Sequence, residues 1–264
     1  MLSKREKERS LKNSKQSCNL DIYYLNLKTG PLLLSSLDSS SDVEKIETIS
    51  LHSSSNLLSE ESRLFVESNL VHQASRAVSY YMQNKHYIPR LFISALVFLI
   101  LYFFLSLVIR DPIPMVDEIL ISLGGTILTW VLLSKRDVHI ALSSKLMLDI
   151  STAIHSLEVV EDDEVNHVEE YLYNLYNRFT IIELANILAK TKDANIPRFN
   201  SVLSEGLKTQ FEYYLSKVDK TLGAYLKLVK KNVSSNEKLS ALLVQSATAE
   251  GLSLEMLLFL AEVL

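Results

Sequence analysis

Residues 91–109 read LFISALVFLILYFFLSLVI, an apolar run without a single charged side chain. A helix over this run rises about 1.5 Å per residue and so spans roughly 28 Å, which matches the hydrocarbon core of a bilayer. The core helices of soluble proteins rarely contain so long a run without a charge. We therefore predict a transmembrane helix over 91–109.

A second apolar run follows at once, over residues 115–134, and it is uncharged from Ile119 onward. Only the short segment 110–114 separates it from the first run, so the two helices would be antiparallel neighbours in the membrane. The sequence thus predicts a transmembrane hairpin at 88–136, with spans at 91–109 and 115–134.

The basic residues around the two runs predict the orientation of the hairpin. Three of them precede the first run and three follow the second, whereas the connecting loop carries only Arg110. Positive residues collect on the cytoplasmic side, so both termini are expected in the cytoplasm, with membrane lipid as a partner. We expect the host membrane to be a bacterial inner membrane. The flanking residues are Arg76, Lys85, Arg90, Lys135, Arg136 and Lys145.

Small side chains form a stripe along the second span. Ser122, Gly125, Thr126 and Thr129 follow the spacing i, i+3, i+4 and i+7, which places them on one helix face. Small residues let helix backbones approach closely in lipid. We predict that this helix-packing face contacts either the first span or a neighbouring subunit.

Asp117 and Glu118 begin the second span and lie at the mouth of the hairpin. In a homo-oligomer they would form an acidic ring that attracts cations, as at the mouth of a pore. The ordinary interpretation is that they are acids in the first turn of a helix, where the helix dipole favours them. Both interpretations stay open at this point.

The region before the hairpin has two parts. Residues 1–58 are polar and serine-rich and are expected to be partly disordered, with a small β-hairpin at 20–35 around the turn signal Lys28–Pro31 and a brief strand at 46–51. Residues 59–86 form an amphipathic cytoplasmic helix that Ser59 can cap. This helix should end before Pro89, because the residue before a proline resists helical geometry.

The chain from 137 to 264 is predicted to be a cytoplasmic helical domain. No proline or glycine occurs between Thr126 and Ile196, so the second span could continue as one helix from Met115 to about Val160. A break near Asp137 is the competing expectation. From Val165 to Ala189 apolar residues keep a helical spacing of three and four, and further helices are expected at 200–231, 237–248 and 253–263.

Two features of this domain are candidate interfaces. Asn186 is a polar position on the apolar stripe of 165–189, where an asparagine can fix the register of packed helices. The last helix carries Leu257, Leu258 and Phe259, and its apolar side chains must dock either on the bundle itself or on a partner. The expected partner is another protein or a second copy of the chain.

Composition excludes several classes of protein. The 264 residues carry a formal net charge of −4, which does not indicate nucleic-acid binding. Cys18 is the single cysteine, so neither an internal disulfide nor a cysteine-based metal site is expected. Glu164 and His167 show the Glu-x-x-His spacing of di-iron proteins, but only once, and chance explains it better. We expect no cofactor, no metal and no enzymatic activity.

The sequence therefore predicts an all-α membrane protein, in which a two-helix transmembrane hairpin carries a cytoplasmic helical bundle and a small β-hairpin lies near the N-terminus. The leading functional hypothesis is a non-enzymatic anchor for a helical interaction or scaffold domain. The alternative is a homo-oligomeric ion channel or an accessory subunit of a transporter, with Asp117 and Glu118 at its mouth.

Overall fold

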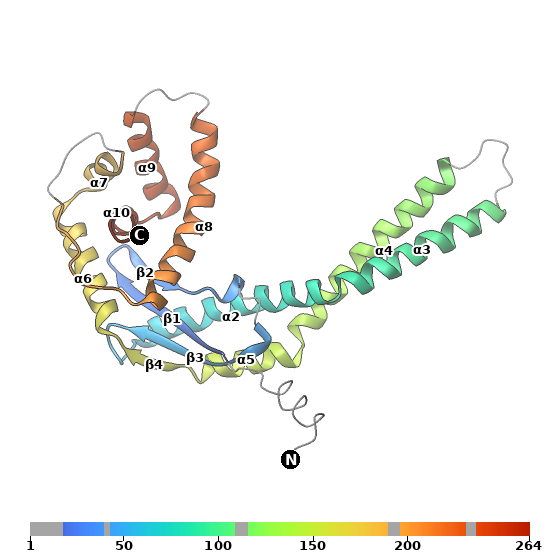
Figure 1. The fold of residues 1–264 in the computed structure, drawn as a ribbon, viewed down its shortest axis with the longest axis horizontal. Helices are drawn as coiled ribbons and strands as arrows, with labels where there is room; N and C mark the ends of the chain where they lie inside the picture. Colours follow the sequence, from blue (N-terminus) through green and yellow to red (C-terminus); the bar gives the residue numbers. More distant parts are fainter. Residues whose placement is uncertain (1–17, 40–42, 109–115, 190–195, 231–235) are drawn as a thin grey trace, which may run out of the picture. The chain divides into compact units, whose positions relative to one another are not determined.

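The computed structural model describes residues 18–39, 43–108, 116–189, 196–230 and 236–264 (Figure 1). It is mostly helical and contains one small four-stranded sheet. Two compact units interleave along the chain. The hairpin unit comprises Met1–Cys18, Leu37–Glu47 and Leu70–His155, and the sheet unit comprises Asn19–Ser36, Thr48–Asn69 and Ser156–Leu264.

The sheet has the strand order β2-β1-β3-β4. Strands β1 (Cys18–Leu27) and β2 (Gly30–Leu34) form the predicted hairpin and pair antiparallel, with Leu27 opposite Gly30 at the turn. Gly30 has a φ of 127°, a backbone conformation that residues with a Cβ atom rarely adopt. Strand β3 (Ile46–Ser53) confirms the brief strand expected at 46–51.

Strand β4 (Glu158–Glu161) was not expected from the sequence. It pairs in parallel with β3, from Ser50 opposite Glu158 to Ser53 opposite Glu161. The all-α description is therefore incomplete, because the N-terminal hairpin belongs to a larger mixed sheet. A strand of four residues whose partner lies a hundred positions earlier leaves little signal in its own sequence.

The helices of the sheet unit enclose an apolar core that also takes side chains from β1 and β2. Phe211 and Phe259 are fully buried there, with ring centroids 5.2 Å apart. The helices are α6 (Asp163–Arg178), α7 (Ile181–Leu188), α8 (Glu205–Lys230), α9 (Asn236–Glu250) and α10 (Leu254–Val263).

The apolar stripe over 165–189 belongs to two helices rather than one. Helix α6 ends at Arg178, and Phe179 has an extended backbone with φ −125° and ψ 142°. Thr180 then caps α7 in a reciprocal capping box with Glu183. The two caps satisfy the backbone groups that a continuous helix would have paired, so the change of direction costs little.

Most of α2 (Glu60–Lys85), together with α3 (Tyr87–Val108), α4 (Val116–Leu142) and α5 (Lys145–His155), forms the hairpin unit. The Ser59 hydroxyl accepts a hydrogen bond from the Ser62 backbone N–H at 3.2 Å and so caps α2. Helix α2 ends at Lys85, before Pro89, as predicted, but the reason expected from the sequence does not hold, because Ile88 directly before the proline is helical and belongs to α3. Pro89 itself lies in the first turn of α3, where its missing N–H has no helical acceptor to lose.

The long continuous helix expected from Met115 to about Val160 is wrong. Helix α4 ends at Leu142, and the Ser144 hydroxyl accepts a hydrogen bond from the Met147 backbone N–H at 3.2 Å, which caps α5. The break therefore lies beyond Asp137. A pair of serines offers backbone groups an alternative to helical pairing, which explains a break without proline or glycine.

Two short 3-10 helices, η1 (Leu37–Ser39) and η2 (Val43–Lys45), also belong to the hairpin unit. Expectations about the N-terminal tail, about Ile109 and Met115 at the ends of the spans and about the loop between the spans concern residues outside those that the structure describes.

Candidate functional site

Helices α3 and α4 present their apolar side chains outward. Within the described residues, Tyr87–Leu107 and Val116–His155 are long and apolar enough to cross a membrane. Only 11% and 6% of their most apolar windows are buried. A core helix of a soluble protein would show the opposite pattern. The exposed side chains on α3 include Phe92, Leu96, Ile100, Phe103, Phe104 and Leu107, and those on α4 include Leu120, Ile127, Leu128 and Leu132.

Helices α3 and α4 pack side by side (Figure 1). A Cβ atom added to Gly125 would overlap with Cδ1 of Leu101 on α3, whereas one added to Gly124 would meet nothing within 4 Å. Ser122 is fully buried. The hydroxyls of Thr126 and Thr129 donate to the carbonyl oxygens of Ser122 and Gly125 at 2.7 and 2.8 Å, so they need no partner on another helix.

A cluster of ionisable side chains joins the start of α3 to the last turns of α4, and we call its residues His86, Arg90 and Asp137 the clasp. Arg90 Nε lies 3.5 Å from Asp137 Oδ2, and His86 Nδ1 lies 3.1 Å from Asp137 Oδ1. Arg90 and Asp137 are only 5% and 8% exposed. Arg90 also donates a hydrogen bond of 2.7 Å to the Gln83 carbonyl oxygen, and its guanidinium lies 4.9 Å from the Trp130 ring centre.

Asp117 and Glu118 lie in the first turn of α4, with Asp117 exposed and Glu118 half-buried. Within the part of the chain that the structure describes, no group of three or more His, Cys, Asp and Glu side chains could hold a metal ion. Glu164 accepts a hydrogen bond from the Ser204 backbone N–H at 2.8 Å.

His52 on β3 has carboxylates on both sides. Its Nδ1 lies 3.0 Å from Asp162 Oδ2 and its Nε2 lies 3.7 Å from Asp21 Oδ1. The Tyr23 ring stacks on the imidazole, with 4.8 Å between centroids. Burial, followed by the charge of Asp21, raises the pKa of the Tyr23 phenol. This cluster ties β1 and β3 to the cap of α6.

The two candidate interfaces of the helical domain lie within the chain itself. Asn186 on α7 accepts a hydrogen bond of 2.6 Å from the Ser240 hydroxyl on α9. Leu258 and Phe259 on α10 are 7% and 0% exposed and belong to the core, and Leu257 packs against it. The apolar side chains of α10 were expected to dock either on the helical bundle of this chain or on a partner, and in the structure they dock on the bundle.

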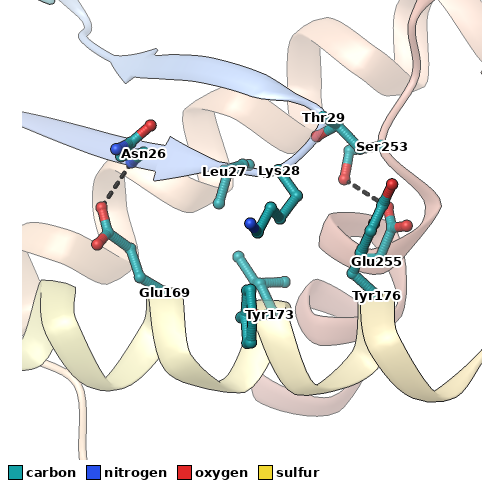
Figure 2. A pocket seen from close by; sticks show the side chains of 10 residues that line it. Asn26, Leu27, Lys28, Thr29, Glu169, Tyr173, Tyr176, Ser253 and Glu255 are labelled. Atoms are coloured by element: carbon teal, nitrogen blue, oxygen red, sulfur yellow. Dashed lines mark hydrogen bonds between the residues drawn. The ribbon is translucent and has the colours of Figure 1, made fainter.

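A cavity of about 220 Å³ opens beside the turn between β1 and β2, and we call it the turn cavity (Figure 2). Helix α6 forms one wall with Glu169, Tyr173 and Tyr176, and the start of α10 contributes Ser253 and Glu255. The lining residues are Asn26, Leu27, Lys28, Thr29, Glu169, Leu172, Tyr173, Tyr176, Ser253 and Glu255.

Lys28 extends from the turn into this cavity, between Glu169 on one side and Glu255 on the other (Figure 2). Its Nζ lies 5.1 Å from the centre of the Tyr173 ring. The Asn26 backbone N–H donates to Glu169 Oε1 at 2.5 Å, and the Ser253 hydroxyl donates to Glu255 Oε2 at 3.0 Å. Carboxylates and aromatic rings therefore surround one ammonium group.

Sequence reasoning did not find the residues of the turn cavity. Part of the signal was present, since Glu169, Tyr173 and Tyr176 follow the spacing i, i+4 and i+7 and so share one face of α6. Lys28 and Glu255 lie more than 200 residues apart, and nothing local indicates that they meet. The same holds for the clasp, in which Arg90 and His86 meet Asp137.

In comparisons with known proteins, no protein-family model, no curated protein and no solved structure matches this chain.

Proposed function

We propose that this protein is a non-enzymatic integral membrane protein, in which α3 and α4 cross the bilayer as a hairpin and anchor the sheet unit at the cytoplasmic face. The sheet unit then acts as an interaction domain that binds a partner at the membrane. The observation that carries the proposal is the outward apolar surface of the two helices, whose most apolar windows are 11% and 6% buried.

Water is a poor solvent for this surface. Soluble monomers rarely expose contiguous apolar patches of more than a few hundred Å², and larger ones mark membrane or protein contacts. On α3 the exposed apolar residues lie all around the helix except at the side facing α4, which suits lipid on most sides and one packed neighbour.

The polar groups of the hairpin also suit lipid. Thr126 and Thr129 return their hydroxyl hydrogen bonds to the backbone of the preceding turn. Such bonds satisfy hydroxyls where no water is present. The clasp lies beyond the apolar run, where charged side chains reach the interface, and the excess of basic residues on this side supports a cytoplasmic location of both termini.

The role as an interaction domain is supported by the turn cavity, in which two exposed tyrosines and two carboxylates surround the Lys28 side chain on a well-packed scaffold. Binding sites commonly combine an apolar wall with a few polar groups that orient the ligand. Nothing about this arrangement requires chemistry to be performed on the ligand.

The test exchanges exposed apolar residues for charged ones. Leu96 and Ile100 on α3 are 52% and 58% exposed, so in a soluble protein Leu96→Arg with Ile100→Arg would be harmless. In a bilayer each arginine near the centre of a span costs about 2.5–3.5 kcal/mol of insertion free energy. We expect the wild type to stay in the membrane pellet after alkaline carbonate extraction and the double variant to be lost from it.

The matched control is Leu64→Arg on α2, a residue 61% exposed and outside both candidate spans, which should leave membrane integration unchanged. Recovery of the wild type in the carbonate supernatant without detergent would refute the anchoring role. So would a double variant that partitions like the wild type.

A further inference from the structure

The turn cavity holds an excess of negative charge. Glu169 and Glu255 supply two carboxylates and Lys28 supplies one ammonium, so the lining residues carry a formal net charge of −1. Glu255 is only 6% exposed, and within the described part of the chain its carboxylate accepts a hydrogen bond from the neutral Ser253 hydroxyl alone. Among the described residues, no cationic group lies within ion-pair distance of Glu255. A buried carboxylate in this state is stabilised by any cation that can reach it.

The aromatic wall points to the same kind of ligand. Tyr173 and Tyr176 are 47% and 45% exposed, and their rings face the cavity beside the two carboxylates. The ammonium of Lys28 already lies over the Tyr173 ring, which shows that a cation fits against this wall. Cations gain about 0.5–2 kcal/mol over a tyrosine ring, depending on their desolvation.

We propose that the turn cavity binds an organic cation, a guanidinium or primary ammonium group on an aliphatic chain. Leu27 and Leu172 provide apolar contact for the chain, and the carboxylates of Glu169 and Glu255 accept hydrogen bonds from its charged end. Asn26 uses only Oε1 of Glu169, which leaves Oε2 for the ligand. Groups with N–H donors are favoured over quaternary ammonium, since carboxylates bind donors by charge-assisted hydrogen bonds.

This assignment deepens the proposed interaction role and rests on it, because the cation would be the feature by which the domain recognises its partner. The source of the cation is either an arginine or lysine side chain of a peptide or a free small amine. Lys28 acts as a built-in competitor, since its like charge occupies the same cavity and opposes a second cation.

The test uses the full-length protein in lipid nanodiscs and isothermal titration with butylguanidinium and butylurea. The two probes have nearly the same size and shape, and only the first is charged. We expect butylguanidinium to bind and butylurea to show no detectable binding. Binding should weaken as the salt concentration rises, because salt screens the attraction between the charged end of the ligand and the two carboxylates.

Variants locate the site. Glu255→Gln keeps a partner for Ser253 but removes the charge, and we expect it and Glu169→Gln each to weaken butylguanidinium binding by about tenfold. Lys28→Gln should strengthen binding by about threefold, since a repelling charge is removed. The matched control is Glu170→Gln, an exposed neighbour outside the cavity, which should bind as the wild type does.

Equal binding of butylguanidinium and butylurea would overturn the assignment, and so would unchanged affinity in Glu255→Gln. Thermal unfolding of each variant shows whether weaker binding comes from the lost charge or from loss of the fold. If Glu255→Gln does not fold, Glu169→Gln alone provides the test. Tighter binding of an acetylated Gly-Arg-Gly peptide than of butylguanidinium identifies a peptide as the source, and the reverse identifies a small amine. Carbonate extraction of the same variants tests the membrane anchor separately.

Discussion

Asp137 on α4 and Arg90 on α3 form an ion pair of 3.5 Å between Oδ2 and Nε, although both side chains are almost completely buried. Removing one partner of a buried pair leaves an uncompensated charge, which costs about 3–5 kcal/mol. We expect Asp137→Ala to lower the free energy of unfolding in detergent by about that amount. Denaturant unfolding followed by Trp130 fluorescence measures it.

The control for the clasp is Asp149→Ala, which removes an exposed carboxylate from α5 and should change stability by less than about 0.5 kcal/mol. Replacing both partners, as Arg90→Leu with Asp137→Leu, should restore a large part of the loss, because no charge then stays buried. A single variant as stable as the wild type would show that water or lipid headgroups already solvate Arg90.

Gly125 and Gly124 provide a matched pair for the helix contact. We expect Gly125→Leu to destabilise the hairpin by about 1–3 kcal/mol, because its side chain would collide with Leu101 in a packed interface. Gly124→Leu meets open space and should behave as the wild type does. Thermal unfolding in lipid nanodiscs compares them. Equal stability of the two variants would contradict the packing of α4 on α3 through Gly125.

Tyr171 should make stability fall at high pH. Burial, and next the hydrogen bond of 2.6 Å to Glu262 Oε2, raises the pKa of its phenol far above the usual value of about 10. Above about pH 10 the phenol of Tyr171 loses its proton in the unfolded chain but keeps it in the folded chain. The free energy of unfolding therefore declines as the pH rises. Tyr171→Phe should show a shallower decline between about pH 9.5 and 11.5 in chemical unfolding experiments.

Tyr171→Phe should also cost about 1–2 kcal/mol at neutral pH, since Glu262 loses its phenolic donor. Tyr173→Phe changes an exposed phenol on the same helix and serves as the control. Identical pH profiles for Tyr171→Phe and the wild type would mean that another group is responsible for the alkaline loss of stability.

Cys18 permits a test of orientation with the natural sequence, because it is the single cysteine and its side chain is exposed. With both termini in the cytoplasm, a membrane-impermeant maleimide should label Cys18 only after the cells are opened. In a Cys18→Ser background, Asp111→Cys should be labelled in intact cells. The reverse labelling pattern would place the sheet unit on the outer side.

Asp117 and Glu118 test the channel alternative. We expect liposomes containing the protein to pass no more cations than empty liposomes, and Asp117→Asn with Glu118→Gln to change nothing. A cation flux that the double variant abolishes would favour a pore over an anchor. Fluorescent flux assays on the same preparations decide between the two.

The apolar hairpin could be predicted from the sequence because transfer into lipid is a property of one segment at a time. The run at 91–109 contains no charged residue, and most of α3 lies within it, although the helix begins four residues earlier at Tyr87. The same is true of the turn before Gly30 and of the cap at Ser59, where each signal lies within four residues of the feature it produces.

Only the tertiary structure determines the contacts between residues that are distant in the sequence. Strand β4 exists because Glu158–Glu161 pairs with the edge of β3, whereas the sequence predicted a helix that continues to about Val160. The clasp needs α3 and α4 at one particular register, and the turn cavity needs Lys28, Glu169 and Glu255 brought together from three separate elements. Their energies depend on burial and on the charges nearby, which no local stretch of sequence contains.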